Sequence, residues 1–149
     1  MGLILFPDFG FADSKKGPAQ GFIGDIEEMT KPNSDYRHVL YTAAEMQLVL
    51  MALQPGDEIG EEVHEDGAQF IRVEMGNGEV WIDGKMTKIQ SDIAVVVPAG
   101  AQHNIKNTGN KPLKLYTFYA PPEHVDGTVH TTKADAEASQ EHFDGGTTE

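Results

Sequence analysis

The stretch that decides the fold is PGDEIGEEVHEDGAQ, residues 55–69, together with PAGAQHNIKN, residues 98–107. In the first stretch Glu62 and His64 are two positions apart, so on an extended strand both side chains point to the same face. Asp66-Gly67 then offers a tight turn back onto a neighbouring strand. Both stretches therefore combine strand spacing with turn residues, as expected for β-hairpins.

Four side chains in these stretches can offer nitrogen or oxygen to one cation. Gln69 returns on the strand after the first turn, and His103 follows the Pro-x-Gly turn of the second stretch. With Glu62 and His64 they come from two distant hairpins, which suits a metal site inside a small β-barrel. Two histidines and one carboxylate also form the ligand set of non-haem iron oxygenases, and other divalent metals accept the same donors. We therefore predict one divalent metal (Fe, Mn, Ni, Co or Zn) bound by Glu62, His64, Gln69 and His103.

The chain from residue 37 to residue 119 has the pattern of short β-strands. Apolar, β-branched and aromatic runs alternate with Gly, Pro, Asn and Asp turns, which is typical of a barrel or sandwich. The expected strands are 37–42, 46–53, 60–64, 68–75, 79–82, 86–89, 93–97, 103–107 and 113–119. Strict alternation along 68–75 would point Gln69, Ile71, Val73 and Met75 inward.

These two stretches resemble the two motifs of the cupin family. The first cupin motif reads Gly, five residues, His-x-His, three or four residues, Glu, six residues, Gly; the second reads Gly, five residues, Pro-x-Gly, two residues, His, three residues, Asn. The matching positions lie between residues 46 and 119 and are Gly56, Glu62, His64, Gln69, Gly76, Asp92, Pro98, Gly100, His103 and Asn107. Three of them depart from the pattern, because Glu62 replaces a His, Gln69 replaces the Glu and Asp92 replaces a Gly.

The resemblance implies an all-β fold, a jelly-roll barrel of two antiparallel sheets, also called a double-stranded β-helix. We expect an N-terminal extension at residues 1–20, the cupin barrel at 21–122 and a C-terminal tail at 123–149. The Ala, Glu and Gln content of residues 133–143 favours a short helix, which Thr131 or Thr132 can cap. Because this segment has few apolar residues, we place it on the surface or at a subunit contact.

Size and charge limit the classes of protein that this sequence fits. A chain of 149 residues suits one domain whose core needs no disulfide, and there is no cysteine. A formal net charge of −13 argues against nucleic acid and against an anionic membrane surface as partners. No apolar run approaches the ~20 residues of a spanning helix, and the N-terminus lacks the basic start of a signal peptide. We therefore expect a cytoplasmic protein.

The resemblance also implies chemistry on a small, oxygen-rich metabolite, by dioxygenation or by isomerisation and enol chemistry. Two alternatives stay open, since fold does not decide function. One is a non-catalytic module that binds or senses a sugar or other metabolite around a structural metal; the other is a barrel that has lost its metal. Candidate acid–base residues are Tyr41, Tyr119 and His124. Aromatic side chains on both faces of the last strand, including Tyr116 and Phe118, predict an outer face covered by a second subunit, hence a homodimer.

Overall fold

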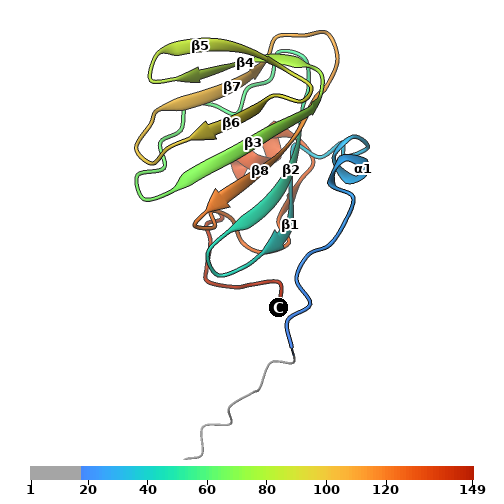
Figure 1. Cartoon of the computed structure of the whole chain (residues 1–149), viewed down its shortest axis with the longest axis vertical. Coiled ribbons are helices and arrows are strands. Elements are labelled where there is room, and N and C mark those ends of the chain that lie inside the picture. The colour runs from blue at the N-terminus through green and yellow to red at the C-terminus, as the bar shows by residue number, and fades with distance from the viewer. Residues whose placement is uncertain (1–17) are drawn as a thin grey trace, which may run out of the picture.

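The computed structural model describes residues 18–149, which form two antiparallel sheets packed against each other (Figure 1). The larger sheet has the strand order β6-β3-β8-β2-β1-β9 and the smaller has the order β5-β4-β7. The larger sheet is built from β1 (Arg37–Thr42), β2 (Gln47–Leu53), β3 (Ala68–Met75), β6 (Ala94–Val97), β8 (Leu113–Ala120) and β9 (Val129–His130). The smaller contains β4 (Asn77–Ile82), β5 (Lys85–Gln90) and β7 (His103–Asn107). The jelly-roll barrel expected from the sequence is confirmed.

Eight of the nine expected strands are present, with ends that differ by at most two residues. The exception is 60–64, which contacts β7 through isolated bridges and forms no regular strand. The two bridges pair Glu58 with Lys106 and Glu62 with His103. The chain therefore advances four residues from Glu58 to Glu62 while β7 advances only three opposite it. Gly60 absorbs the extra residue at φ +103°, a conformation that glycine adopts freely. This bulge interrupts the ladder but leaves Glu62 paired with His103.

Three local features differ from the expectation. Helix α1 (Ile26–Thr30), in a segment for which no helix or strand was predicted, begins where the Asp25 carboxylate accepts a hydrogen bond from the backbone of Glu28. Strand β9 pairs with β1, so part of the C-terminal segment joins the larger sheet. Helix α2 (Lys133–Ala138) is shorter than expected because Ser139 leaves the helical conformation, although Thr132 caps it as predicted. Neither helix in residues 18–149 is long and apolar enough to cross a bilayer.

The core lies between the inward faces of the two sheets. On β3 the side chains of Gln69, Ile71 and Val73 are buried there as expected. Met75 is 38% exposed instead, whereas Glu74 is 5% exposed. The pairing of β3 with β8 shifts register between Val73 and Met75, so the alternation breaks at that point.

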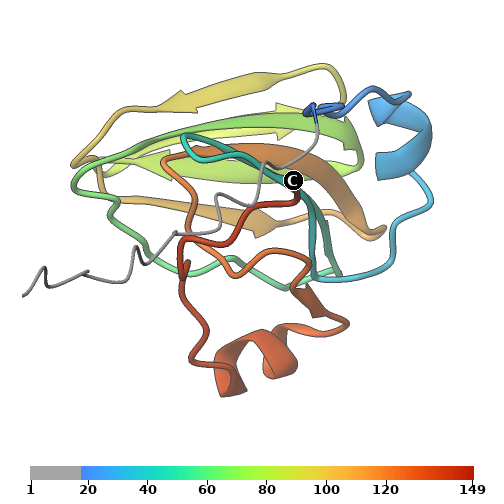
Figure 2. The same cartoon turned by 90° about the horizontal axis from the view of Figure 1, so that it is seen from below.

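The C-terminal segment returns to the barrel after β8. Seen from below, residues beyond β8 run along one side of the two sheets, and α2 lies at the outside of this layer (Figure 2). Helix α2 has no buried residue, although Ala136 packs against the core cluster. Residues 123–142 therefore form a wall beside the barrel, and this wall borders the site described below. The N-terminal extension expected at 1–20 lies almost wholly outside the described residues.

Candidate metal centre

Three side chains converge where the bulged segment meets β7. Glu62, His64 and His103 each contribute a ligand atom to a group in which all the atoms lie within 4.8 Å of one another. Glu62 Oε2 is 3.4 Å from His64 Nε2 and 3.9 Å from His103 Nε2. Gln69 reaches the same place from β3, with its Oε1 2.9 Å from His103 Nε2. The structure thus brings together all four side chains that the sequence singled out as ligands.

The spacing and burial of these atoms fit a divalent cation. Ligands that bind a metal at ~2.0–2.2 Å lie about 3–3.5 Å from one another, close to the separations observed. Glu62 Oε2 and His64 Nε2 are both buried, and neither has a hydrogen-bond partner among the described residues. Buried polar atoms without partners are costly, and a cation between them would remove that cost.

The hydrogen bonds of Gln69 give a second, independent fit. The hydroxyl of Thr117 donates to the carbonyl of Phe70, so it accepts from Gln69 Nε2 at 3.0 Å. Gln69 Oε1 is thereby turned toward His103. His103 Nδ1 donates to the carbonyl of Ala101 at 3.0 Å, which leaves the lone pair on Nε2. Two electron-pair donors therefore face each other at 2.9 Å, an arrangement that a shared cation stabilises.

Both histidines are held by partners outside the ligand group. His64 Nδ1 lies 3.2 Å from Glu123 Oε1, and His103 Nδ1 is fixed by the Ala101 carbonyl. Carboxylates and carbonyls in this position orient metal-binding histidines and increase their basicity. The adjacent Glu62 carboxylate, 3.4 Å from Nε2, and the charge of Glu123 raise the pKa of His64, although its burial acts in the opposite direction.

A cavity of ≈ 230 Å³ opens beside two of these side chains, Glu62 and His64. Its wall is formed partly by the barrel and partly by the C-terminal segment. The lining residues include Arg37, Glu62, His64, Tyr119, His124 and Glu141. The volume is smaller than the ~300–1,000 Å³ of pockets for drug-sized ligands, so it suits a small metabolite.

Two of the three acid–base candidates line this cavity. Tyr119 is 2% exposed, and its ring packs edge-on against His64 at 5.6 Å and against His124 at 5.4 Å between centroids. Burial raises the pKa of Tyr119 well above its usual value. Burial and the nearby charge of Arg37 lower the pKa of His124 to about 4. Tyr119 therefore stays a phenol and His124 a neutral imidazole near neutral pH.

The third candidate, Tyr41, lies elsewhere. Its hydroxyl donates to Glu149 Oε1 at 3.0 Å, and its ring packs against Phe22 at 6.3 Å between centroids. It lines a different cavity, together with Phe22 and Thr148. The structure does not bring Tyr41 to the metal centre, because its side chain reaches across to the last residue of the chain.

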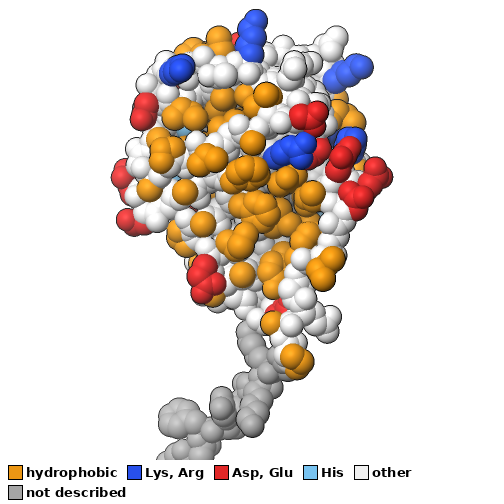
Figure 3. Space-filling model, in the orientation of Figure 1, with side chains coloured by type: hydrophobic (Ala, Val, Ile, Leu, Met, Phe, Trp, Pro, Cys, Tyr) orange, Lys and Arg blue, Asp and Glu red, His pale blue; other side chains and the backbone are white. Residues whose placement is uncertain are grey.

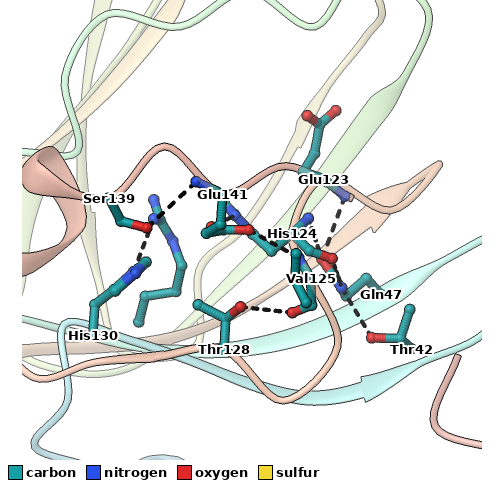
Figure 4. Close-up of polar contacts among 10 residues, drawn as sticks. Thr42, Gln47, Glu123, His124, Val125, Thr128, His130, Ser139 and Glu141 are labelled. Carbon is teal, nitrogen blue, oxygen red and sulfur yellow. Dashed lines mark hydrogen bonds and ion pairs between the residues drawn. The ribbon is translucent and has the colours of Figure 1, made fainter. Parts of the chain in front are cut away.

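Two residues that the sequence did not single out fix His124 (Figure 4). Glu141 Oε1 accepts from His124 Nδ1 at 2.7 Å, and Oε2 accepts from the backbone of Val125. Although burial of Glu141 raises its pKa, the bonds from Val125 and His124 hold that pKa below its usual value. Gln47 is fully buried on β2; its Oε1 accepts from the backbone of His124, and its Nε2 donates to the carbonyl of the same residue.

The sequence contains only weak indications that Gln47, Glu141, Glu123 and Arg37 belong to this site. A Gln at the start of the apolar strand 47–53 indicates a buried polar contact, but it does not identify the partner. Glu123 and Glu141 lie after the predicted barrel, in an acidic chain where most carboxylates are solvated. Arg37 is one of only two arginines, and nothing local connects it to a site 25 or more positions away. Only the return of the C-terminal segment brings these side chains together.

Comparison with known proteins places the chain in a family. The family model described as a cupin domain matches residues 49–119. YrkC of Bacillus subtilis is 46% identical over 145 residues, covering 93% of this chain and 73% of YrkC. L612 of Acanthamoeba polyphaga mimivirus is 39% identical over 115 residues, covering 74% and 71%. The crystal structure of BH2720 from Bacillus halodurans matches with a TM-score of 0.79 at 45% identity, covering 83% of this chain and 97% of that one. The chain therefore belongs to the cupin family.

Proposed function

We propose that this protein is a metal-dependent enzyme that acts on a small, oxygen-rich metabolite. The observation that carries the proposal is the convergence of Glu62, His64, Gln69 and His103, two of whose buried polar atoms have no hydrogen-bond partner among the residues that the structure describes. Glu62 and His64 also line a small cavity. The reaction class is dioxygenation or isomerisation through an enol. The non-catalytic binding module is the alternative that the experiment below must exclude.

The four ligands would hold one divalent metal, which when bound supplies Lewis acidity or oxygen activation. Glu62 is the one anionic side chain among them, so a divalent site keeps a net positive charge. Such a site favours substrates that offer two adjacent oxygens. Because the other three ligands are neutral, the bound metal would be more electrophilic than a metal held by several carboxylates.

His124 and Tyr119 are the proposed acid–base residues. Because His124 Nδ1 donates its hydrogen to Glu141, the lone pair is on Nε2, and this atom can accept a proton. Tyr119 keeps its proton and can donate a hydrogen bond to an oxygen that gains negative charge. The Glu141–His124 pair would thus act as the base and Tyr119 as the donor, each within the wall of the same cavity.

The test is elemental analysis of protein from iron-supplemented cells, followed by a turnover screen under air and under nitrogen. The screen uses catechols, β-diketones and unsaturated uronates, with an oxygen electrode in the aerobic arm. Oxygen uptake with product would support dioxygenation, and product under nitrogen would support isomerisation. A double variant, His64→Ala with His103→Ala, should contain no stoichiometric metal and no activity. Stoichiometric metal and tight binding without product in either arm would instead favour the binding module.

A further inference from the structure

The cavity wall contains a buried cation that the proposed reaction does not use. Arg37 opens β1 and is 9% exposed, and it lines the cavity together with Glu62, His64 and His124. Its Nη1 donates to His130 Nδ1 at 3.4 Å, and its guanidinium carbon lies 5.7 Å from the centre of the Tyr36 ring. Its Nε is buried and has no hydrogen-bond partner in the described part of the chain.

Arg37 also has no direct ion-pair partner among the described residues, although its charge contributes to the lowered pKa of Glu141 in the same cavity wall. Within residues 18–149, no carboxylate oxygen lies within 4.0 Å of its guanidinium nitrogens in an ion pair. An arginine stays charged at any accessible pH, and burying an unpaired charge is expensive. An anion bound beside the guanidinium would offset that cost with charge-assisted hydrogen bonds.

The carboxylates around the cavity are already engaged. Glu62 points to the metal position, Glu123 is paired with His64, and Glu141 is paired with His124. Arg37 is the one Lys or Arg among the cavity-lining residues that the structure describes. In a chain of net charge −13, one unpaired buried cation at the cavity wall is a feature that selects for a negatively charged ligand.

We propose that Arg37 binds the carboxylate of the substrate, so that the substrate class is small carboxylic acids that also carry a pair of adjacent oxygens. The oxygen pair would face the metal ligands, and the carboxylate would lie against the guanidinium fork, whose donors match it geometrically. This inference rests on the proposed function of the same site and narrows its substrate.

Two probes with the same metal-binding group and different charge test the assignment. They are 4,6-dioxoheptanoate, a β-diketone with a carboxylate, and heptane-2,4-dione, which has the diketone alone. Manganese-loaded wild-type protein is titrated with each by calorimetry. We expect the acid to bind about tenfold or more tightly than the neutral diketone, as a charge-assisted hydrogen bond would give.

Three variants separate recognition from support of the fold. Arg37→Gln should lose the preference for the acid while keeping its metal and its affinity for the neutral diketone. Arg37→Lys keeps the charge without the fork and should retain part of the preference, even if Arg37→Gln fails to fold. The matched control is Arg72→Gln on β3, because Arg72 already pairs with Glu74 and Asp92 outside the cavity. This variant should keep the full preference.

The metal-free protein is titrated in parallel, because an arginine can hold a carboxylate without metal. The acid should bind there more weakly but with the same dependence on Arg37. Equal affinity of the wild type for acid and neutral diketone, or full preference in Arg37→Gln, would overturn the assignment of Arg37. Failure of the wild type to load metal or to bind the neutral diketone would count against the proposed function instead, and the metal-free titration would still decide on Arg37.

Discussion

At the scale of single residues, the distinctive feature of the centre is its charge. Glu62 stands where the usual cupin motif has a histidine, and Gln69 stands where it has a glutamate. The two exchanges leave one negative ligand in the group but move it from β3 to the bulged segment before β3. A metal bound by these four side chains would therefore meet the same net ligand charge as in the usual motif, with the negative charge at a different position.

Replacing Glu62 should show how far this single charge determines metal affinity. Glu62→Gln keeps the shape and removes the charge, so we expect a substantial loss of affinity for manganese or nickel in titrations of the apo protein. Glu62→His restores the common cupin pattern and should still bind metal, with altered or lost turnover. Equal affinity in the wild type and both variants would place Glu62 outside the ligand group.

A second residue-scale prediction concerns the buried neutral His124. Its pKa in the folded protein is about 4, against ~6.5 in an unfolded chain. As pH falls from 6.5 to 4, the unfolded state takes up a proton that folded His124 does not, so stability falls through this window and levels off below it. The wild type should therefore lose about 2 kcal/mol more stability between pH 7 and pH 5 than His124→Asn, which cannot titrate.

Urea unfolding of both proteins at the two pH values measures this difference. Asn is the matched replacement because its amide can still donate a hydrogen bond to Glu141. Titrating groups that His124 does not contact, including His64 with its raised pKa, are present in both proteins and cancel in the comparison. An identical loss of stability in the two proteins would mean that His124 is accessible to protons in the folded state.

At the scale of elements, glycines decide how closely segments approach. Gly76, between β3 and β4, has φ +93°, and a Cβ there would lie 2.6 Å from the carbonyl oxygen of Pro112. Gly56 has φ +86°, but no atom lies within 4 Å of the place where its Cβ would be. The two positions have similar positive φ angles, but only at Gly76 would a Cβ meet a neighbouring backbone atom.

Alanine at these two glycines should separate backbone strain from steric clash. Gly56→Ala should cost about 1 kcal/mol, the usual penalty of a left-handed conformation for a residue with a Cβ. Gly76→Ala should cost about 3 kcal/mol or more, since the Pro112 backbone must also shift. The measurement is the midpoint and slope of urea unfolding, and equal costs at the two sites would show that the Pro112 segment moves freely.

Among the elements, the turn before β6 shows why Asp92 can replace a glycine of the usual cupin motif. This residue replaces the glycine that begins the second cupin motif and has φ +73°, a conformation that aspartate tolerates better than most residues with a side chain. Its carboxylate accepts from Arg72 at 2.9 Å, and its backbone N–H donates to Val73. The turn before β6 is thus kept with a different residue.

At the scale of the whole molecule, the outer face of the larger sheet is strongly apolar. The rings of Phe70, Tyr116 and Phe118 contact one another with centroids 6.1–6.3 Å apart. Val96 on β6 is 64% exposed, and Met46 is 41% exposed. Apolar side chains gather over the middle of this side of the molecule (Figure 3). Patches of this kind mark interaction surfaces.

We therefore expect a homodimer in solution, with this face as the contact. Phe118→Glu should shift the protein to monomer, because a charge would be buried against the partner's apolar surface. Trp81→Gln is the control, since Trp81 is 42% exposed but lies on the smaller sheet. Light scattering at micromolar concentration measures the mass. A stable mass near that of one 16.3 kDa chain for the wild type would contradict the prediction.

The sequence by itself determined the local parts of this protein. Strand positions followed from alternation and turn chemistry, because both act over a few residues. The four candidate ligands followed from the spacing within two motifs, since each hairpin fixes its own side-chain directions, and the structure brings their side chains together. The predicted strand at 60–64 and the predicted inward position of Met75 were wrong, because pairing with a distant strand interrupted the alternation of side chains. Residues 60–64 lost their strand to the bulge at Gly60, and Met75 left the core at the register shift opposite β8.

The tertiary structure alone decided the second half of the site. Arg37, Gln47 and Glu141 come from the start of the barrel and from the segment after it, and no local pattern links them. They meet because β9 pairs with β1, because Gln47 holds the backbone of His124, and because Glu141 reaches the ring of His124. Such contacts depend on the path that the whole C-terminal segment takes across the barrel. Many weak packing contacts together determine that path. Residue spacing therefore predicted the candidate metal ligands, and only the folded chain revealed the charges that surround them.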